Sequence, residues 1–258
     1  MIKPFFKNIN SFIPSVSVDC VVFGYHDSKL HVLLLKFKQV DAWAIPGGFV
    51  PFNKKMEDVV HEVLKERTGL NQIFLEQFHT FSSVNRGWDS TAVSKKAFEQ
   101  VMKDWKGKKA KKVNAWLKQR FITTAFIALI NSESIVPIPD HASELCTWIP
   151  VDNLPSLILD HQEIIEKALE HLREKINYLP IGRSLLPERF TMYQLQTLYE
   201  SITGKTQDRG NFQRKVISLK VLERHDKMMS GAQNKAPFLY SIKNEVYDEL
   251  LKTGVRFL

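Results

Sequence analysis

A short polar segment between residues 208 and 219 has the side-chain types that read DNA. Phe212, Val216 and Leu219 recur at helical spacing, which predicts one buried face. Arginine and lysine suit guanine edges and phosphates, and asparagine and glutamine can pair with adenine. The outward-facing or flanking residues of these types are Asn211, Gln213, Arg214 and Lys215. The segment therefore predicts a recognition helix for double-stranded DNA.

A helix is expected before this segment, and it has clear end signals. Thr191 and Gln194 have the T-x-x-Q spacing of a capping box, which satisfies two backbone donors at a helix N-terminus. Gly204 marks the end of this helix, and the second helix is expected to begin at Asp208. Two short helices in this order form the first part of a winged helix-turn-helix.

A basic ribbon is expected after the second helix. Leu222–Arg224 and Phe238–Ile242 have the composition of strands, and Lys227 and Lys235 lie between them. A wing of this kind can place either lysine against phosphate or in a minor groove. The alternative, which the local pattern leaves open, is a pair of ordinary packed helices with solvated basic faces.

Positive charge is concentrated in two regions of the chain. The net charge is +8, and Lys95–Arg120 contains ten Lys and Arg against two acidic residues. Residues 181–258 contain thirteen basic and eight acidic residues, so the rest of the chain is acidic. Two basic regions favour a polyanionic partner, although a lysine-rich helix is also an ordinary solvated surface.

Composition argues against several other classes of protein. The chain has no apolar run long enough to cross a membrane and no charged-then-apolar leader, so we expect a cytoplasmic protein without a membrane partner. Cys20 and Cys146 lie in apolar, strand-like contexts without metal-ligand spacing, which predicts buried free thiols. We therefore expect no cofactor and no redox chemistry.

The first part of the chain alternates strands and helices, as in an α/β or α+β domain. A turn signal at His26, Asp27 and Ser28 separates two β-rich runs, and Gly69 closes a helix with an apolar stripe. The expected strands and helices are Val16–Phe23, His31–Phe37, Trp43–Val50, Met56–Thr68, Phe74–Phe81, Phe121–Ile130, Leu145–Pro150 and His161–Ile176.

Two segments interrupt or end this first domain. A lysine-rich helical insert is expected at about 91–120, and the proline- and glycine-containing stretch Tyr178–Pro187 is expected to be a linker. We therefore divide the chain into a first domain, residues 1–177, and a second domain, residues 178–258. The apolar positions expected on the buried face of the insert are Phe98, Val101, Met102 and Trp105.

One motif connects the helix at 56–68 with phosphate chemistry. From Gly48 to Leu70 the chain follows the length and register of a Nudix box, G-x5-E-x7-R-E-U-x-E-E-x-G-U, where U is aliphatic. The matching residues are Gly48, Leu64, Glu66, Gly69 and Leu70. The departing residues are Lys54, Glu62, Val63 and Arg67.

These departures decide the expected chemistry of the box. Nudix hydrolases hold Mg²⁺ or Mn²⁺ on several helix carboxylates, because a divalent ion must neutralise a diphosphate and activate water. Of positions 63, 66 and 67 only Glu66 is acidic, and Arg67 adds a positive charge beside it. We therefore expect no metal site and no catalytic residue.

Lys54 and Glu62 exchange the signs of a pair that is common in Nudix boxes. An ion pair between them would keep the geometry of the loop although catalysis is lost. The alternative is two unrelated exposed charges.

A degenerate Nudix domain followed by a winged helix resembles the Nudix-related transcriptional regulators, a bacterial family that includes repressors of NAD metabolism and of arabinose use. The resemblance also rests on Leu185–Thr191, Leu195–Glu200, Asp208–Lys215 and Pro237–Tyr240. It implies an α+β fold, in which a Nudix-like α/β/α sandwich with a mixed sheet precedes a winged helix-turn-helix. It also implies a homodimer that binds palindromic operator DNA and releases it when a small molecule occupies the Nudix pocket.

The resemblance assigns residues to both functions. The expected DNA contacts are Arg209, Asn211, Gln213, Arg214, Lys215, Lys227 and Lys235. The expected effector contacts, between the sheet and the box helix, are Phe49, Glu66, Phe81, Arg86, Trp88 and Asp89. Each of these six also suits a surface or packing role. The effector is expected to be a sugar or an ADP-ribose-like nucleotide-sugar, and similarity at Gln77–Phe81 favours the sugar.

Two other functions compete with this prediction. A Nudix pyrophosphohydrolase of a nucleoside diphosphate derivative would need metal ligands from outside the box, and Val63 and Arg67 argue against it. An RNA-binding module that uses Lys95–Arg120 has no stacking platform or RNA motif behind it. A ligand-responsive DNA-binding regulator that is not an enzyme is therefore the predicted function.

Overall fold

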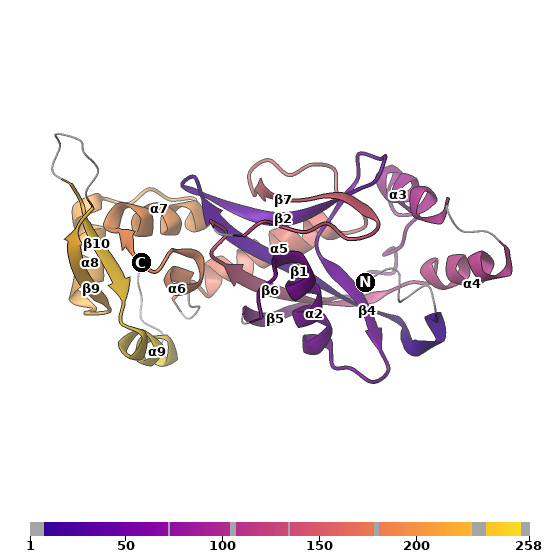
Figure 1. Ribbon diagram of the computed structural model, residues 1–258, viewed down its shortest axis with the longest axis horizontal. Coiled ribbons are helices and arrows are strands. Elements are labelled where there is room, and N and C mark those ends of the chain that lie inside the picture. Colours follow the sequence, from indigo (N-terminus) through magenta and orange to yellow (C-terminus); the bar gives the residue numbers. More distant parts are fainter. Residues whose placement is uncertain are drawn as a thin grey trace. The chain divides into compact units, whose positions relative to one another are not determined.

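The computed structural model describes residues 8–71, 73–103, 107–133, 135–177, 181–228 and 236–253, which form two compact units (Figure 1). The first unit comprises Met1–Phe23, His31–Ala128 and Ile135–Ala168. The second comprises Gly24–Leu30, Leu129–Ser134 and Leu169–Leu258. The chain therefore passes between the units inside β1, β2, β6 and α5, and the predicted linker at 178–187 belongs to the second unit.

The core of the first unit is a seven-stranded sheet. Its strand order is β3-β2-β1-β6-β5, with β4 paired to β1 and β7 paired to β2. The pairings of β4, β3 and β7 are antiparallel. The strands are β1 (Phe12–His26), β2 (Lys29–Phe37), β3 (Trp43–Ala44), β4 (Gly47–Pro51), β5 (Phe74–Phe81), β6 (Ile122–Ile130) and β7 (Ser143–Pro150).

The turn between β1 and β2 forms where the sequence predicted it. Asp27 and Ser28 have φ angles of 49° and 58°, so both lie in the left-handed region. Two such residues in a tight hairpin loop match the right-handed twist of the flanking strands, and aspartate tolerates this conformation better than most residues. Both strands run longer than the sequence pattern indicated.

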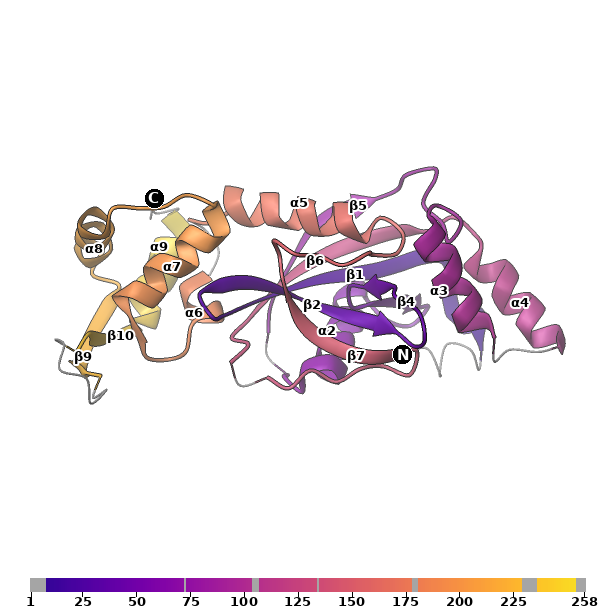
Figure 2. The same cartoon turned by 90° about the horizontal axis from the view of Figure 1, so that it is seen from above.

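Two helices cover opposite faces of the sheet (Figure 2). Helix α2 (Met56–Thr68) lies on one face and α5 (His161–Glu174) on the other. Helix α2 begins and ends where its periodicity predicted, and it buries Val59, Val60, Val63 and Leu64. It stops at Gly69, whose φ of 75° lets its N–H bond to Lys65 O.

The insert is two helices and not one continuous helical segment. Helices α3 (Ala92–Met102) and α4 (Gly107–Leu117) lie together at one end of the sheet (Figures 1 and 2). Thr91 caps α3 by accepting a hydrogen bond from Ser94 N at 3.0 Å. Val101 and Met102 pack on the core as predicted, whereas Trp105 lies outside the described residues. The buried members of this core are Phe98, Val113, Trp116, Leu117 and Phe121.

The second unit contains a three-stranded sheet of order β8-β10-β9. Its strands are β8 (Phe190–Thr191), β9 (Leu222–Lys227) and β10 (Phe238–Ile242). Its helices, after the end of α5, are α6 (Ile181–Leu185), α7 (Met192–Thr203), α8 (Arg209–Ser218) and α9 (Asn244–Thr253). Thr191 and Gln194 form the predicted capping box at the start of α7.

Two helices differ from the sequence-based expectation. The predicted linker at 178–187 contains α6, whose Ile181 and Leu185 are buried and so anchor it in the domain core. Helix α9 was not predicted from the sequence. Its Tyr247 is 2% exposed, so this side chain anchors the helix in the same core. None of the described helices combines the length and the apolar character needed to cross a membrane.

Candidate functional site

A cavity of about 160 Å³ lies in the first unit. Residues of β1, β2 and β4 line it, together with the turn Arg86–Trp88, the insert helices and the start of α5. Its apolar wall includes Phe37, Phe49, Trp88, Leu117 and Phe121. Asp19, Arg86 and His161 supply much of its polar surface. A mostly apolar cavity with a few convergent polar groups is the usual form of a small-molecule site.

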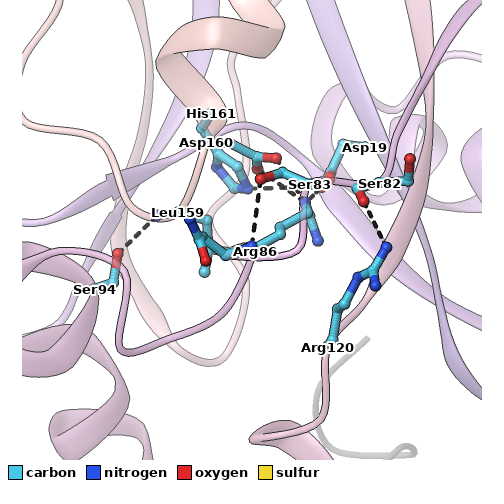
Figure 3. A network of polar contacts seen from close by, with 10 residues as sticks. Asp19, Ser82, Ser83, Arg86, Ser94, Arg120, Leu159, Asp160 and His161 are labelled. Carbon is cyan, nitrogen blue, oxygen red and sulfur yellow. Dashed lines mark hydrogen bonds and ion pairs between the residues drawn. The ribbon is translucent and has the colours of Figure 1, made fainter.

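Arg86 is the centre of the polar part of this cavity (Figure 3). Its Nη2 donates to Asp19 Oδ2 at 2.8 Å, and its Nε lies 2.9 and 2.8 Å from the two carboxylate oxygens of Asp160. The guanidinium side chain is only 4% exposed. Two carboxylates therefore share one buried cation, and their charge-assisted hydrogen bonds offset much of its desolvation.

A close approach between strands positions the carboxylate of Asp19. Asp19 lies opposite Gly47 in the β1–β4 pairing. A Cβ atom at position 47 would lie 2.4 Å from Asp19 Oδ1 and 2.7 Å from Val18 O. Glycine is therefore required at 47, because any side chain there would displace the carboxylate that binds Arg86.

His161 is neutral and has one defined tautomer. Burial lowers its pKa, while the neighbouring Asp19 carboxylate opposes this shift and Arg86 adds to it. Its Nδ1 accepts a hydrogen bond from Ile45 N at 3.2 Å, so the ring proton sits on Nε2. That nitrogen lies 3.8 Å from Asp19 Oδ1. His161 therefore presents an N–H group to the acidic side of the cavity.

The insert helices build the aromatic wall of the cavity. Phe49 packs edge-on against Trp116 with ring centroids 4.8 Å apart, and it lies 5.5 Å from Phe121. Trp88 packs against Phe98 of α3 at 5.6 Å. Ser94 Oγ accepts a hydrogen bond from Leu159 N at 2.7 Å, which ties α3 to the segment before α5 (Figure 3). The insert thus belongs to the cavity and not only to the surface.

The box helix α2 carries its charges elsewhere. Arg67 is buried and points to the segment before β7, where it lies 3.7 Å from Asp140 Oδ2 and donates to Ile138 O at 3.4 Å. Glu66 is 48% exposed and lies 3.3 Å from Arg67 Nη2. Among the described residues, no group of three or more His, Cys, Asp or Glu side chains is placed to hold a metal ion. The remaining box carboxylate thus stands beside a cation.

Lys54 and Glu62 form the ion pair that their exchanged signs predicted. Their side chains are 35% and 49% exposed, so solvent screens the pair and its contribution to stability is small. The pair nevertheless connects the loop after β4 to the middle of α2.

The structure brings together part of the predicted effector set. Phe49, Arg86 and Trp88 line the cavity, and Asp89 lines a neighbouring hollow with Arg86 and Trp88. Phe81 is buried and packs against Phe78 and His79 of the same strand. Glu66 lies on the exposed side of α2. Neither residue lines the cavity or the neighbouring hollow. Sequence reasoning missed Asp19 and His161, which line the cavity, and Asp160, which pairs with Arg86. A lone aspartate within the apolar run of β1 was the one available signal.

A second candidate site lies on α8, in the second unit. Asp208 caps the helix by accepting a hydrogen bond from Asn211 N at 2.8 Å. Phe212 and Val216 are buried, and Phe212 packs 6.1 Å from Tyr199 of α7. Leu219 and Gln213 are half-buried. On α8, the exposed residues of the predicted DNA-contact set are Arg209, Asn211, Arg214 and Lys215.

The cations of α8 are free of carboxylates within the described part of the chain. Arg214 contacts Asn211 Oδ1 and Gly210 O on its own helix. Arg209, Arg214 and Lys215 form no ion pair among the described residues. Arg86 differs from these cations, because its guanidinium is paired with the carboxylates of Asp19 and Asp160.

The wing adds a further basic surface. Phe238 at the start of β10 holds two cations, with Lys227 Nζ 5.3 Å and Arg224 Cζ 4.6 Å from its ring centroid. Arg224 was missed by sequence reasoning, because only its register with β10 places it there. Lys235 lies outside the described residues.

The ends of β1 and α5 that belong to the second unit form hydrogen bonds to α7. Tyr25 at the end of β1 and Thr197 of α7 share a hydrogen bond between their hydroxyls at 2.5 Å. Arg173 near the end of α5 donates through Nε to Ile202 O at 2.8 Å. Asp19, in the middle of β1, and His161, at the start of α5, line the cavity.

Comparison with known proteins identifies the second unit. Residues 182–242 match the NrtR DNA-binding winged helix domain. The chain carries an NrtR-type winged helix domain. The matched segment runs from α6 through α7, α8 and both wing strands, so it includes every described residue of the predicted DNA-contact set.

Relatives extend the match over most of the chain. The chain is 26% identical over 245 residues to the ADPR responsive transcriptional repressor NtrR of Acinetobacter baylyi, and the match covers 91% of this chain and 84% of that protein. The crystal structure of Shewanella oneidensis NrtR complexed with a 27mer DNA has a TM-score of 0.63 and 24% identity, covering 90% of this chain and 95% of that chain. A MutT/nudix family protein from Enterococcus faecalis has a TM-score of 0.61 and 22% identity, covering 90% and 87%. The predicted fold, a Nudix-like domain followed by a winged helix-turn-helix, is confirmed.

Proposed function

We propose that this protein is a transcriptional repressor that binds operator DNA through α8 and the wing and responds to an ADP-ribose-type ligand in the Nudix-like domain. The observation that carries the proposal is the set of exposed, carboxylate-free cations of α8 within the matched winged helix domain. Such side chains reach base edges and phosphates when a recognition helix enters the major groove. Two copies of the chain would present paired helices to a palindromic site.

The DNA contacts follow from exposure and type. Arg209, Asn211, Arg214 and Lys215 are exposed on α8, with Gln213 at its flank. Lys227 sits on the wing, where phosphates or a minor groove would lie. Lys235 lies outside the described residues and stays a prediction from the sequence. Of this set, Arg214 is the best reader of guanine, because its guanidinium can donate two parallel hydrogen bonds.

ADP-ribose is favoured over a free sugar as the effector. The relative in Acinetobacter baylyi is named as ADPR-responsive, and it matches nearly the whole chain. The apolar cavity with Phe49 and Trp88 suits an aromatic base or a sugar face, and Asp19 with His161 suits hydroxyl groups. A free sugar would leave most of the aromatic wall without an aromatic partner.

We further propose that the Nudix-like domain binds this ligand without hydrolysing it. Val63 is buried in the helix interface, and Arg67 is turned to Asp140, so two of the three expected carboxylate positions of the box are occupied by other chemistry. Glu66 alone would have to hold the metal while paired with Arg67. The residues of the box therefore argue against the alternative function, a pyrophosphohydrolase.

Coupling between ligand and DNA would use β1 and α5. Asp19 in the middle of β1 and His161 at the start of α5 line the cavity, and farther along the same elements Tyr25 and Arg173 form hydrogen bonds to α7. A ligand that shifts Asp19 or His161 would act on both elements at once. Ligand binding and DNA binding would then oppose each other through one coupling free energy.

The test begins by selecting a binding site from a random duplex library with the full-length protein. On the selected duplex, Arg214→Ala should weaken specific binding by about 1–3 kcal/mol, as measured by fluorescence anisotropy. Lys252→Ala on α9 is the matched control, because that exposed lysine lies outside the matched domain. Equal affinities for wild type and Arg214→Ala would remove Arg214 from the interface.

The effector part is tested on the same complex. ADP-ribose should release the duplex at concentrations where ribose and arabinose do not, and incubation with Mg²⁺ or Mn²⁺ should yield no AMP by chromatography. Failure of the protein to select any duplex would refute the repressor proposal. Rapid turnover of ADP-ribose would refute the non-catalytic role.

A further inference from the structure

A second hollow adjoins the ligand cavity of the first unit. It has a volume of about 320 Å³ and shares Arg86, Gly87 and Trp88 with the cavity. The residues that line only this hollow include Lys118 and Arg120, which follow helix α4 of the insert. The two spaces therefore meet at one turn of the chain but have different chemistry.

Among the described residues that line the inner cavity, Arg86 is the one Lys or Arg side chain, and it is already paired with carboxylates. Arg86 is divided between the carboxylates of Asp19 and Asp160, so this cluster has one more negative than positive charge. Asp140, which also lines the cavity, pairs with Arg67. A diphosphate placed entirely inside would face carboxylates without a compensating cation, which is strongly unfavourable in a buried site.

The outer hollow supplies the missing charge. Arg120 Nη2 donates to Ser82 O at 2.7 Å, which holds the guanidinium against the loop that also carries Arg86 (Figure 3). Lys118 Nζ lies 5.7 Å from the ring of Phe98. Asp89 is the one carboxylate in the lining, so cations exceed acids there. Neither Lys118 nor Arg120 pairs with a carboxylate among the described residues.

The position of Arg120 leaves donors available for a ligand. A guanidinium has five N–H donors, and Ser82 O uses one of them. A planar guanidinium and an ammonium that line one hollow suit the oxygens of one or two phosphate groups. Gly87, between the two spaces, has no atom within 4 Å of where a side chain would begin, so a ligand can pass close to the backbone there.

We propose that this hollow is a phosphate-binding subsite, in which Lys118 and Arg120 hold the phosphates of a nucleoside diphosphate derivative while the rest of that ligand enters the apolar cavity. The proposal rests on the proposed function and specifies how the ligand is held. It gives the insert a defined role, because α4 leads directly to both cations. Protein cations here take over charge neutralisation from the metal ion that an intact Nudix box would bind.

The test is calorimetric titration of the full-length protein with ADP-ribose and, in parallel, with adenosine, which lacks phosphate. The double variant Lys118→Gln/Arg120→Gln should bind ADP-ribose about 10- to 100-fold more weakly, because two charge-assisted contacts are lost. Its affinity for adenosine should be unchanged. Added NaCl should weaken ADP-ribose binding to wild type more than to the double variant.

The matched control is Lys111→Gln/Lys112→Gln, which removes two exposed cations of α4 that line neither space. It should bind ADP-ribose like wild type. Thermal unfolding of each variant checks that the fold is intact. All variants should retain duplex binding without ligand, and loss of it in the Lys118/Arg120 variant would mark a DNA surface and overturn the proposal.

Three further outcomes distinguish failure of the phosphate subsite from failure of the proposed effector. If the double variant binds ADP-ribose as tightly as wild type, the subsite is wrong and the proposed effector stands. An equal loss for adenosine would show that the residues shape the cavity and do not bind phosphate, which also overturns the subsite. Absence of ADP-ribose binding by wild type would refute the proposed effector together with the subsite.

Discussion

The box helix α2 and the Arg86 cluster are two charged regions of one domain with opposite physical character. On α2, Glu62 and Glu66 are about half exposed and pair with neighbours on the same helix or an adjacent loop. At the cluster, Arg86 and Asp19 are buried and pair across the sheet and loops. The difference teaches that the carboxylates of the box helix are exposed to solvent, whereas the buried charges that shape the cavity lie outside the motif.

The sharpest test of this comparison removes a charge from each region. Arg86→Leu should lower the free energy of unfolding by about 3–5 kcal/mol, because it leaves Asp19 and Asp160 buried without a cation. Glu66→Gln should change it by about 0.5 kcal/mol or less, since that side chain is 48% exposed. Urea unfolding followed by circular dichroism measures both. Similar losses for the two variants would contradict the contrast between buried and exposed charge.

A second test perturbs the cluster without touching its charges. Gly47→Ala should cost about 1–3 kcal/mol, because the new methyl group would lie 2.4 Å from Asp19 Oδ1. Gly87→Ala is the matched control, since an added Cβ meets nothing within 4 Å there. That control should be neutral or stabilising by up to about 1 kcal/mol. Thermal unfolding of the pair decides the matter, and a silent Gly47→Ala would show that the strand contact is looser than the distances indicate.

The smallest expected effect is on the box side of the comparison. Lys54→Glu should lower stability by about 1 kcal/mol or less, because it replaces a solvent-screened ion pair by two like charges. Adding Glu62→Lys to the same chain should restore the loss by re-forming the pair in reverse. Differential denaturation of the single and double variants at low salt measures this. A double variant no more stable than the single one would mean that the two charges do not interact.

Much of the local structure could be predicted from the sequence, because local signals coincide with tertiary packing there. The periodicity at 56–68 and Gly69 give the bounds of α2, and the Thr191–Gln194 capping box begins α7. The short α6 and the terminal α9 were missed, since their stability comes from burying Ile181, Leu185 and Tyr247 in a core assembled from distant segments.

The candidate site was predictable in part for the same reason. Arg86 and Trp88 attract notice as an arginine and an aromatic residue in a loop, and Phe49 follows the box glycine. Asp160 and His161, by contrast, read as the ordinary start of a helix. Nothing local indicates that this helix start meets β1 and the loop after β5.

By itself, the sequence determined which carboxylates the Nudix box lacks and which segment carries a capped, basic helix. Val63 and Arg67 stand where a metal site needs carboxylates, and Asp208–Lys215 carries the spacing of a capped, basic helix, so both conclusions rest on residue identity alone. Only the tertiary structure decided where the ligand cavity lies. Arg86 meets Asp19 and Asp160 across 67 and 74 residues of chain, a union that sheet pairing and packing create and that no local pattern encodes.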